Sequence, residues 1–527
     1  MSTLPVASTV LRDLAGAPAR AARPAIAGPT FGERMRFAAL VPVNLVVKLA
    51  CIRFESFLAL FERLTPAFLD WAGRWRARAA FYRAVRTVPA YRQFLRSAGF
   101  RGGTPPETDK ENYIRRYRTE RRCVGGRLPL SHMTIDESSG STGTPYNWVR
   151  SDRERHESHI FVSYFAQYCY GREPYITLNA FSMGAWATGI NMGVAMARHG
   201  LVKCTGPDID KILHTMRFFG PSYHYLIAGY PPFLKHLIDV GEARGFPFEQ
   251  FRMRALVGGE GMAEGLRDYL LRRFAAVFSG FGATDLEIGI AGETPQAIAI
   301  RRLCRQRPEV RTALFGSDSR LPMLFQFNPL MHYVEVNANR ELLFTISRKS
   351  LLSPRVRYNV HDEGGVARHD EMQRKLAACG IDLDALGARA GYKRLPLPFF
   401  WIYGRRDYTV SVMGANIYPE DIEQCLYAEP ALARTTHSFC LALEEGAGAA
   451  VNPKFVFEID AEPTAELAAT FRTSMLERLI ALNADFREAW KEYPQSVTPV
   501  IELHRCGTGP FAVDAARIKQ VRLLKRA

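Results

Sequence analysis

The chain has 527 residues, of which 47% are hydrophobic and 23% are charged. These proportions are typical of a packed soluble protein and exclude a fibrous or wholly disordered chain. The net charge of +16 favours an anionic partner such as a nucleotide, an anionic lipid or nucleic acid. The basic residues form no run interleaved with aromatic residues, so we predict that nucleic acid is not the partner.

The N-terminal segment 1–31 is rich in Ala, Pro and Arg and lacks the apolar core of a secretory signal, so we predict disorder there. The helix-period pattern of residues 32–100 predicts a helical region. Its most apolar stretch, "FAALVPVNLVVKLACIRF", contains Pro42, Asn44 and Lys48, which argue against a membrane span. A packed helix is our prediction, and peripheral membrane contact through residues 32–64 is the alternative.

From about residue 130 onward, short apolar runs alternate with helical stretches. The strand candidates are "PYITLNAF", "SYHYLIAGY", "MRALVGGE", "AAVFSGFGATD" and "ELLFTIS", and "PPFLKHLIDVGEARG" is a helix candidate. This alternation predicts an α/β fold with mostly parallel sheets over residues 101–403, with ligands at the carboxyl ends of the strands. The Pro-rich "RLPLPFFWIYGRRD" predicts a hinge, followed by a small mobile α+β domain at 404–527.

The nine cysteines are widely spaced and form no C-x-x-C pair, so neither a disulfide framework nor a zinc ribbon is indicated. We predict reduced thiols in a cytoplasmic protein, with membrane association as the alternative.

The stretch "DESSGSTGTPYNW", residues 136–148, combines glycines and hydroxyls between an acidic pair and an aromatic run. Glycine lets backbone N–H groups approach an anion, and hydroxyls donate further hydrogen bonds, as a phosphate loop requires. It is not a P-loop, because no lysine follows Gly143. The residues alone leave two readings open, a linker and a phosphate-binding loop.

Five segments in chain order carry a family resemblance: "SSGSTGTP", "VGGEGM", "FSGFGATDLEIG", "RVRYNVHDEGG" and "YGRRDYTVSVMGANIYPEDIE". Together they resemble the adenylate-forming (acyl-CoA synthetase) superfamily, and within it the phenylacetate–CoA ligase-like branch. The resemblance implies a large adenylation domain with a mobile C-terminal lid. It also implies that ATP activates a carboxylic acid as an acyl-adenylate, that coenzyme A then displaces AMP, and that Mg²⁺ assists.

The resemblance also implies residue roles. Thr284 would donate to the α-phosphate, Arg405 would approach the ribose or phosphate, and Asp407 would mark the hinge. The implied nucleotide contacts are Ser138, Ser139, Gly140, Ser141, Thr142, Gly143 and Thr144 at the β- and γ-phosphates, Gly258, Gly259 and Glu260 beside adenine, Phe281 stacked on adenine with Gly282 following it, and Asp362 on the ribose hydroxyls.

The sequence departs from the family pattern at several positions. Thr144 stands where the phosphate loop normally has lysine, and Asp285 stands where the Mg²⁺-binding glutamate is expected. Asp285 is our predicted metal ligand, bound directly or through water, with Glu287 as a substitute. The segment "YNVHD" retains only its aromatic residue and Asp362. Lys519 is our candidate for the catalytic C-terminal lysine, against the alternative of a basic helix without a catalytic role.

An acyl pocket is expected along "NAFSMGAWATGINMG", with Phe181, Met183 and Trp186 as an apolar wall and Gly184 making room. This composition favours an aromatic or fatty monocarboxylic acid. Two alternatives stay open: an adenylating enzyme with an amine, carrier-protein or inorganic co-substrate, and a degenerate nucleotide-binding scaffold. A homodimer is a further candidate assembly.

Overall fold

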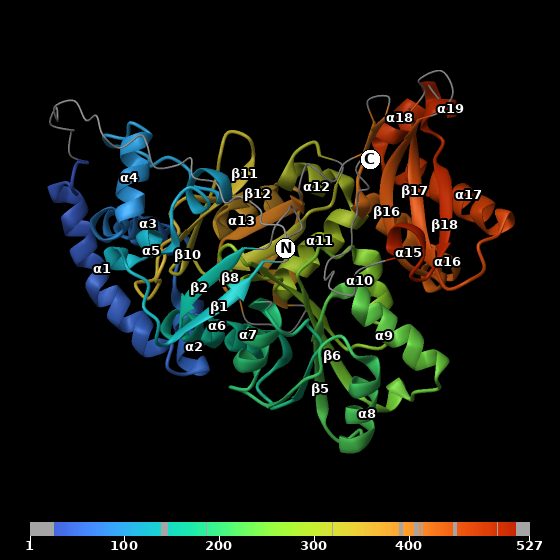
Figure 1. The fold of residues 1–527 in the computed structure, drawn as a ribbon, viewed down its shortest axis with the longest axis horizontal. Helices are drawn as coiled ribbons and strands as arrows, with labels where there is room; N and C mark the ends of the chain where they lie inside the picture. The colour runs from blue at the N-terminus through green and yellow to red at the C-terminus, as the bar shows by residue number, and fades with distance from the viewer. Residues whose placement is uncertain are drawn as a thin grey trace, which may run out of the picture.

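The computed structural model describes residues 26–138, 146–185, 187–318, 320–388, 394–404, 410–412, 415–445, 451–492 and 494–512. In Figure 1 the N-terminal helices lie at one end, an α/β body in the middle, and the C-terminal residues at the other end. The segments predicted as 1–31 and 404–527 therefore fall only partly within the described residues.

The N-terminal part consists of α1 (Phe31–Ala50), α2 (Phe54–Arg63), α3 (Pro66–Thr87) and α4 (Pro89–Ser97). Thr30 and Glu33 form a capping box that starts α1. Glu33 also pairs with Arg78 of α3 at 2.9 Å and accepts from Tyr82, so α1 is held against α3. None of the described helices is long and apolar enough to cross a membrane.

The body is built on one eleven-stranded sheet in the order β10-β11-β12-β13-β9-β8-β7-β6-β5-β3-β4. The strands β4, β3, β5, β6 and β7 are parallel neighbours, and the remaining pairs are antiparallel. The α/β fold class is confirmed, with the parallel pairing confined to one half of the sheet. The strand bounds are β3 Ile176–Asn179, β4 Leu201–Cys204, β5 His224–Gly229, β6 Arg252–Gly258, β7 Val277–Ala283, β8 Glu287–Gly292, β9 Met323–Phe327, β10 His332–Val336, β11 Glu341–Ile346, β12 Tyr358–Ala367 and β13 Phe399–Gly404.

A separate two-stranded hairpin, β1 (Met133–Glu137) and β2 (Asn147–Ser151), precedes the sheet. Helices cover the sheet; α6 packs on β8 and α11 on β9. The helix bounds are α5 Thr119–Arg122, α6 Asp152–Tyr170, α7 Ala187–Met196, α8 Ile209–Phe219, α9 Pro231–Ala243, α10 Glu264–Leu270, α11 Pro295–Gln306, α12 Pro308–Phe315, α13 His369–Ala378 and α14 Leu383–Ala388, with short turns η1 Lys110–Ile114, η2 Val124–Gly126 and η3 Phe248–Gln250.

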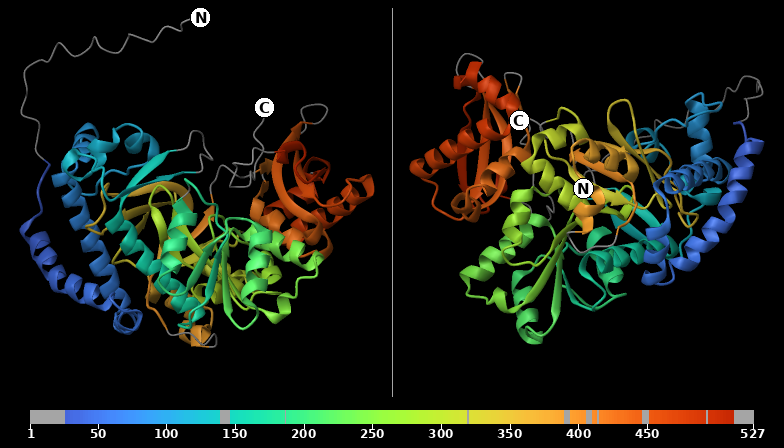
Figure 2. Two further views of the ribbon diagram at one scale, coloured as in Figure 1. Left: turned by 60° about the horizontal axis from the view of Figure 1, so that its bottom comes forward. Right: turned by 180° about the vertical axis from the view of Figure 1, so that it is seen from behind.

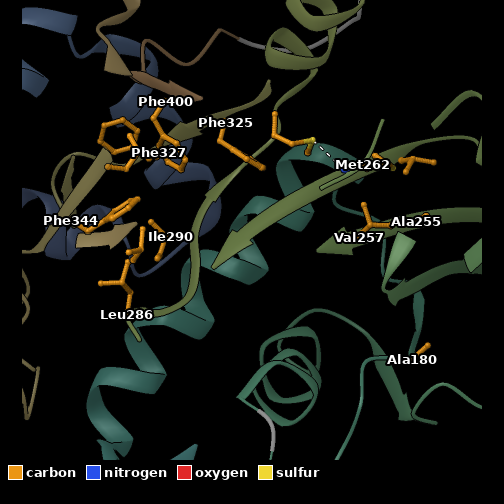
Figure 3. Packing of buried hydrophobic residues seen from close by; sticks show 14 of the residues in the cluster. Ala180, Ala255, Val257, Met262, Leu286, Ile290, Phe325, Phe327, Phe344 and Phe400 are labelled. Atoms are coloured by element: carbon orange, nitrogen blue, oxygen red, sulfur yellow. Dashed lines mark hydrogen bonds between the residues drawn. The ribbon is translucent and has the colours of Figure 1, made fainter. Parts of the chain in front are cut away.

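Aromatic side chains fill the antiparallel half of the core. Figure 3 shows Phe325, Phe327, Phe344 and Phe400 gathered together, with Ile290 and Leu286 beside Phe344. All of these side chains are buried. The turn between β7 and β8 therefore rests on a packed apolar base.

The C-terminal part has its own apolar core, formed by residues between Val410 and Ile501. Its three-stranded sheet has the order β16-β17-β18. The elements are β14 Val410–Val412, β15 Ala415–Ile417, α15 Pro419–Tyr427, α16 Pro430–Thr435, β16 Thr436–Glu445, β17 Val451–Ile459, α17 Ala465–Leu482, α18 Ala484–Glu492, α19 Pro494–Val497, β18 Val500–Arg505 and η6 Gly509–Phe511. Figure 2 shows this part beside α9 and α10, on the side of the body away from α1.

Candidate functional site

The carboxyl ends of the parallel strands bring several predicted segments to one edge of the sheet. Asn179 ends β3, Gly258 ends β6 and Ala283 ends β7. The predicted acyl, adenine and α-phosphate segments begin at or directly after these residues. Ligands of open α/β sheets bind at this edge, so the arrangement matches the expectation from sequence.

The predicted phosphate loop leaves β1 and returns into β2. At its base, the Ser138 and Tyr146 backbones form a 3.0 Å hydrogen bond, and the Ser138 hydroxyl accepts from the Tyr146 N–H at 3.0 Å. The Glu137 N–H donates to the carbonyl of Ala185 at 2.9 Å, which ties the loop base to the acyl segment. Ser139, Gly140, Ser141, Thr142, Gly143 and Thr144 lie outside the described residues.

The turn at Thr284 and Asp285 is held from three directions. Arg150 of β2 donates to the Thr284 carbonyl. Arg355 donates through Nε to the Asp285 carbonyl at 2.8 Å, and the Tyr358 hydroxyl donates to the Asp285 carboxylate at 2.7 Å. The structure therefore joins the predicted metal ligand to the aromatic residue of "YNVHD", although 73 residues separate them in sequence.

Arg150 is also the centre of a buried group that we call the site ion cluster: Asp136, Arg150, Glu154, Glu287 and Arg348. Arg150 Nε lies 3.0 Å from Asp136 Oδ2, and its Nη1 lies 3.7 Å from Glu154 Oε1. A cavity of about 10 Å³ lies between four of these residues and two others: Asp136, Arg150, Glu154, Glu287, Thr284 and Asn191. That volume is about the room one water molecule needs.

Burial raises the pKa of Glu154 above its ordinary value, although Arg150 and Arg348 lie close. Burial acts on Glu287 in the same sense, but its pairing with Arg348 and His332 outweighs that effect and lowers its pKa. Burial and repulsion from Arg150 lower the pKa of Arg355 to about 10. Displaced pKa values of this kind concentrate at functional sites.

Glu287 was the predicted substitute for the Mg²⁺ ligand. Its carboxylate is buried and contacts both Arg348 and His332. These two cationic or hydrogen-bonding partners occupy the oxygens that a metal would need. Asp285, which is half-buried at the turn, therefore remains the better candidate of the two.

Two predicted glycines are explained by close packing. Gly259 has φ of 85°, and a Cβ there would lie 2.6 Å from the Tyr230 ring. A Cβ on Gly282 would lie 2.9 Å from the Glu287 carbonyl oxygen across the β7–β8 hairpin. Both positions thus require glycine whether or not a nucleotide binds, and Gly258 pairs with Gly280 between β6 and β7.

The aromatic candidates lie partly in the core. Phe281 is half-buried, and its ring stacks on Phe344 with centroids 5.9 Å apart. Phe181 is buried and packs edge-on against Tyr230, with centroids 5.1 Å apart. Met183 is half-buried beside Gly189, and Gly184 is exposed with φ of 92°. The roles of these residues and of Glu260 stay predictions.

Asp362 lies in the middle of β12, which leads through β13 toward the C-terminal part. Its neighbour Glu363 pairs with Arg320 at 3.0 Å. The Arg320 guanidinium stacks over Tyr403 of β13 and Tyr418 before α15, which links the end of the body to the C-terminal part. Trp186, Arg405, Asp407 and Lys519 lie outside the described residues.

Three residues that hold the turn and the loop base were not predicted from the sequence: Arg150, Arg355 and Glu154. Arg150 follows the apolar "NWV", and Arg355 lies in "SPRVRY", so each is a charge within or beside an apolar run. A charged residue in or beside an apolar run is expected to be buried, and charged residues are seldom fully buried without a partner. This pattern could have identified both arginines as members of a buried ion cluster.

No protein-family model matches the sequence, and no curated protein matches it. Among solved structures, 2-hydroxyisobutyryl-CoA ligase in the postadenylation state with R3-HIB-AMP is similar, with a TM-score of 0.62 and 16% identity. The match covers 88% of this chain and 91% of that chain. The chain has the fold of an adenylate-forming CoA ligase.

The same ligase matches in two further structures. With 2-HIB-AMP in the postadenylation state the TM-score is 0.61, at 16% identity and with 88% and 90% of the two chains covered. In an open conformation with 2-HIB-AMP and CoA it is 0.52, at 14% identity and with 88% and 93% covered. These matches cover both the body and the C-terminal part of the fold. The narrower phenylacetate–CoA ligase-like assignment stays a prediction.

Proposed function

We propose that this protein is an ATP-dependent acid–CoA ligase. A carboxylate oxygen of the acid attacks the α-phosphorus of ATP, which gives an acyl-adenylate and releases pyrophosphate. The thiol of coenzyme A then attacks the acyl carbonyl, and AMP leaves. The protein's task in both steps is to position the reactants and to offset charge on the phosphate oxygens.

The observation that carries this proposal is the position of Arg150. This buried side chain connects Asp136, at the start of the predicted phosphate loop, with the carbonyl of Thr284, the predicted α-phosphate contact. One guanidinium thus sets the spacing between two segments that a nucleotide must bridge. Rigid positioning of this kind is what adenylation demands, since little covalent work falls to side chains.

The acyl group is proposed to be aromatic or fatty. Met183 is half-buried and Phe181 is buried in the segment whose Ala185 carbonyl contacts the loop base, and Gly184 is exposed between them and Ala185. The described part of the segment 181–193 contains no lysine or arginine, so it offers a second substrate carboxylate no cationic partner.

Asp285 supplies an oxygen ligand of the kind Mg²⁺ prefers, and Mg²⁺ would offset phosphate charge there.

ATP–pyrophosphate exchange against a panel of aromatic, fatty and small acids tests the proposal. We expect exchange with one class of acid, and its loss in Asp362→Ala. Adding coenzyme A should then release AMP and form a thioester detectable by mass spectrometry. ATP binding without exchange for any acid would contradict the proposal.

A second candidate is a nucleotide-binding scaffold that has lost catalysis. It is favoured by Glu287, which Arg348 and His332 engage, and by Thr144, which stands where a lysine is expected. It predicts that ATP or AMP binds by calorimetry while no pyrophosphate forms. A third candidate is an adenylating enzyme that transfers the acyl group to an amine or a carrier-protein thiol, or that activates an inorganic acid. It predicts ATP–pyrophosphate exchange, but no release of AMP when coenzyme A is added.

We further propose that α1 contacts an anionic membrane surface. Six large apolar side chains of α1 are more than half exposed: Phe31, Met35, Val41, Leu45, Val46 and Leu49. Arg34, Arg36 and Lys48 lie on the same helix and suit anionic headgroups. Figure 2 shows α1 along the outside of the molecule.

Sedimentation with vesicles tests this contact. We expect binding to vesicles that contain phosphatidylserine, weak binding to phosphatidylcholine alone, and loss of binding in Leu45→Glu. A homodimer formed through the same face is the competing outcome. It would appear as a doubled mass by light scattering that Leu45→Glu abolishes, with no vesicle binding.

A further inference from the structure

Three side chains with metal-binding atoms meet at one end of the sheet β16-β17-β18. His437 lies near the start of β16, Asp460 directly follows β17, and Cys506 directly follows β18. Because β16 is antiparallel to β17 and β18 is parallel to it, all three positions fall at the same edge. Their ligand atoms lie within 4.8 Å of one another.

The local contacts already draw these atoms together. Cys506 Sγ lies 3.4 Å from Asp460 Oδ1, and His437 Nε2 forms an ion pair with the same carboxylate. The register between β16 and β17 shifts between Thr436 and Ser438, so His437 occupies an irregular position in the ladder. Such irregularities re-aim side chains away from the regular alternation.

A fourth candidate ligand comes from the body of the protein. The His236 ring of α9 lies edge-on to the His437 ring, with centroids 4.8 Å apart. Its Nδ1 is buried and has no hydrogen-bond partner among the described residues. Next to it, Lys235 Nζ donates to the Thr436 carbonyl at 2.9 Å. The cluster therefore sits where α9 meets β16.

We propose that His437, Asp460 and Cys506 bind a divalent cation of the zinc class, with His236 as the fourth ligand. Imidazole nitrogen, carboxylate oxygen and thiolate sulfur are each zinc ligands. The thiolate and imidazoles select zinc over Mg²⁺, which prefers oxygen ligands. A tetrahedral site needs ligand atoms about 3.5 Å apart, so small shifts of His437, Asp460 and Cys506 suffice, whereas the neighbouring His236 ring must reorient to join them. Because His236 belongs to the body, the bound metal clamps the C-terminal part onto α9.

Binding must displace the thiol proton. A cysteine thiol with an ordinary pKa of about 8.5 is mostly protonated at neutral pH before a metal binds. The thiolate is the metal ligand, and coordination by a cation removes the proton. Calorimetry in buffers of different ionisation enthalpy should therefore register the released proton.

Titration of the reduced full-length protein with Co²⁺ tests the site. We expect a thiolate-to-cobalt charge-transfer band in the near ultraviolet, absent in Cys506→Ser and present in Cys204→Ser, which removes another exposed cysteine. His437→Gln and Asp460→Asn should weaken Zn²⁺ binding at least about tenfold. Absence of the band, or its persistence in Cys506→Ser, would overturn the proposal.

Hydrogen exchange tests the clamp. We expect Zn²⁺ to slow exchange both in β16–β18 and in α9. His236→Ala should abolish the slowing in α9 and leave that in β16–β18, because the three remaining ligands belong to one sheet. Protection of β16–β18 without any effect on α9 in the parent protein would overturn the clamp.

Discussion

Two buried groups of charges serve the same fold in different ways. The first, which we call the core ion cluster, comprises Glu264, Arg267, Glu293 and Arg301 between α10 and α11. The second is the site ion cluster around Arg150. The core ion cluster has two carboxylates and two guanidiniums with separations of 2.7 to 3.1 Å, and each side chain is at most 2% exposed. Arg302 adds a longer contact of 3.4 Å to Glu264 and is 41% exposed, so the cluster reaches the surface only through this side chain among the described contacts.

The site ion cluster has a different composition. Three carboxylates, Asp136, Glu154 and Glu287, face two arginines and His332, and a small cavity lies beside them. In the core ion cluster, attraction to Arg267 and Arg301 outweighs burial and lowers the pKa of Glu264. In the site ion cluster, burial prevails at Glu154 and raises its pKa, whereas pairing with Arg348 and His332 lowers the pKa of Glu287. Neighbouring carboxylates whose pKa values are shifted in opposite directions beside a cavity are typical of functional sites.

The largest expected effect comes from breaking the core ion cluster. Arg301→Met leaves Glu264 and Glu293 short of a buried partner, so we expect the free energy of unfolding to fall by about 3–5 kcal/mol. Urea denaturation measures it. Arg305→Met, on the same helix but with its exposed pairing to Asp268, should cost less than about 1 kcal/mol. Equal losses in the two variants would remove the distinction between buried and exposed pairs.

The next effect concerns the site ion cluster. Arg150→Met removes the link between Asp136 and the Thr284 carbonyl, so we expect ATP–pyrophosphate exchange to fall about 100-fold. Arg150→Lys keeps the charge but not the forked guanidinium geometry, so its exchange rate should lie between those of the parent protein and Arg150→Met. Circular dichroism checks that each variant is folded. Full exchange in folded Arg150→Met would show that Arg150 has no positioning role.

A matched pair of substitutions sharpens the comparison through pH. Because the pKa of Glu154 is raised in the folded chain, its contribution to stability falls as pH rises from the ordinary glutamate value through the folded one. Glu154→Gln should flatten this fall and leave the protein equally or more stable at neutral pH.

Glu264 has the opposite sign. Its lowered pKa contributes stability above the ordinary glutamate value, and this is lost as pH falls through the folded pKa. Glu264→Gln should therefore destabilise the protein by about 1–3 kcal/mol at neutral pH. Thermal unfolding of the parent and both variants from about pH 2 to about pH 8 covers both windows and measures the two slopes, and slopes of the same sign would refute the contrast.

The smallest effect is expected at the edge of the site. Tyr358→Phe removes the hydrogen bond to Asp285, which should cost about 0.5–1.5 kcal/mol and change the Mg²⁺ concentration that half-saturates exchange by up to about tenfold. Tyr170→Phe removes a bond to the Ala255 carbonyl within the core and should cost similar stability without moving the Mg²⁺ dependence. A change in the half-saturating Mg²⁺ concentration in both variants would show that reduced stability, rather than the bond to Asp285, causes the effect.

The segments of the site were predictable because each carries its own local chemistry. Gly258 and Gly259 end a strand of apolar residues, and the Ser/Gly loop at 138–144 joins two strands, so their sequences marked them without knowledge of the fold. The contact between Tyr358 and Asp285 was not predictable, because nothing local distinguishes those two side chains as partners. Nor was the pairing of Glu287 with Arg348, since it depends on the segment after β11 reaching both α6 and β8.

The sequence by itself determined the α/β class, the helical N-terminus and the order of the Gly-rich turns, because periodicity and turn chemistry are local properties. Only the tertiary structure decided how the sheet divides into parallel and antiparallel halves and which charges are buried together. It also decided that His236 meets His437 across two parts of the chain. Burial and pairing of charges depend on surroundings that distant segments supply, and the sequence around each residue carries no record of them.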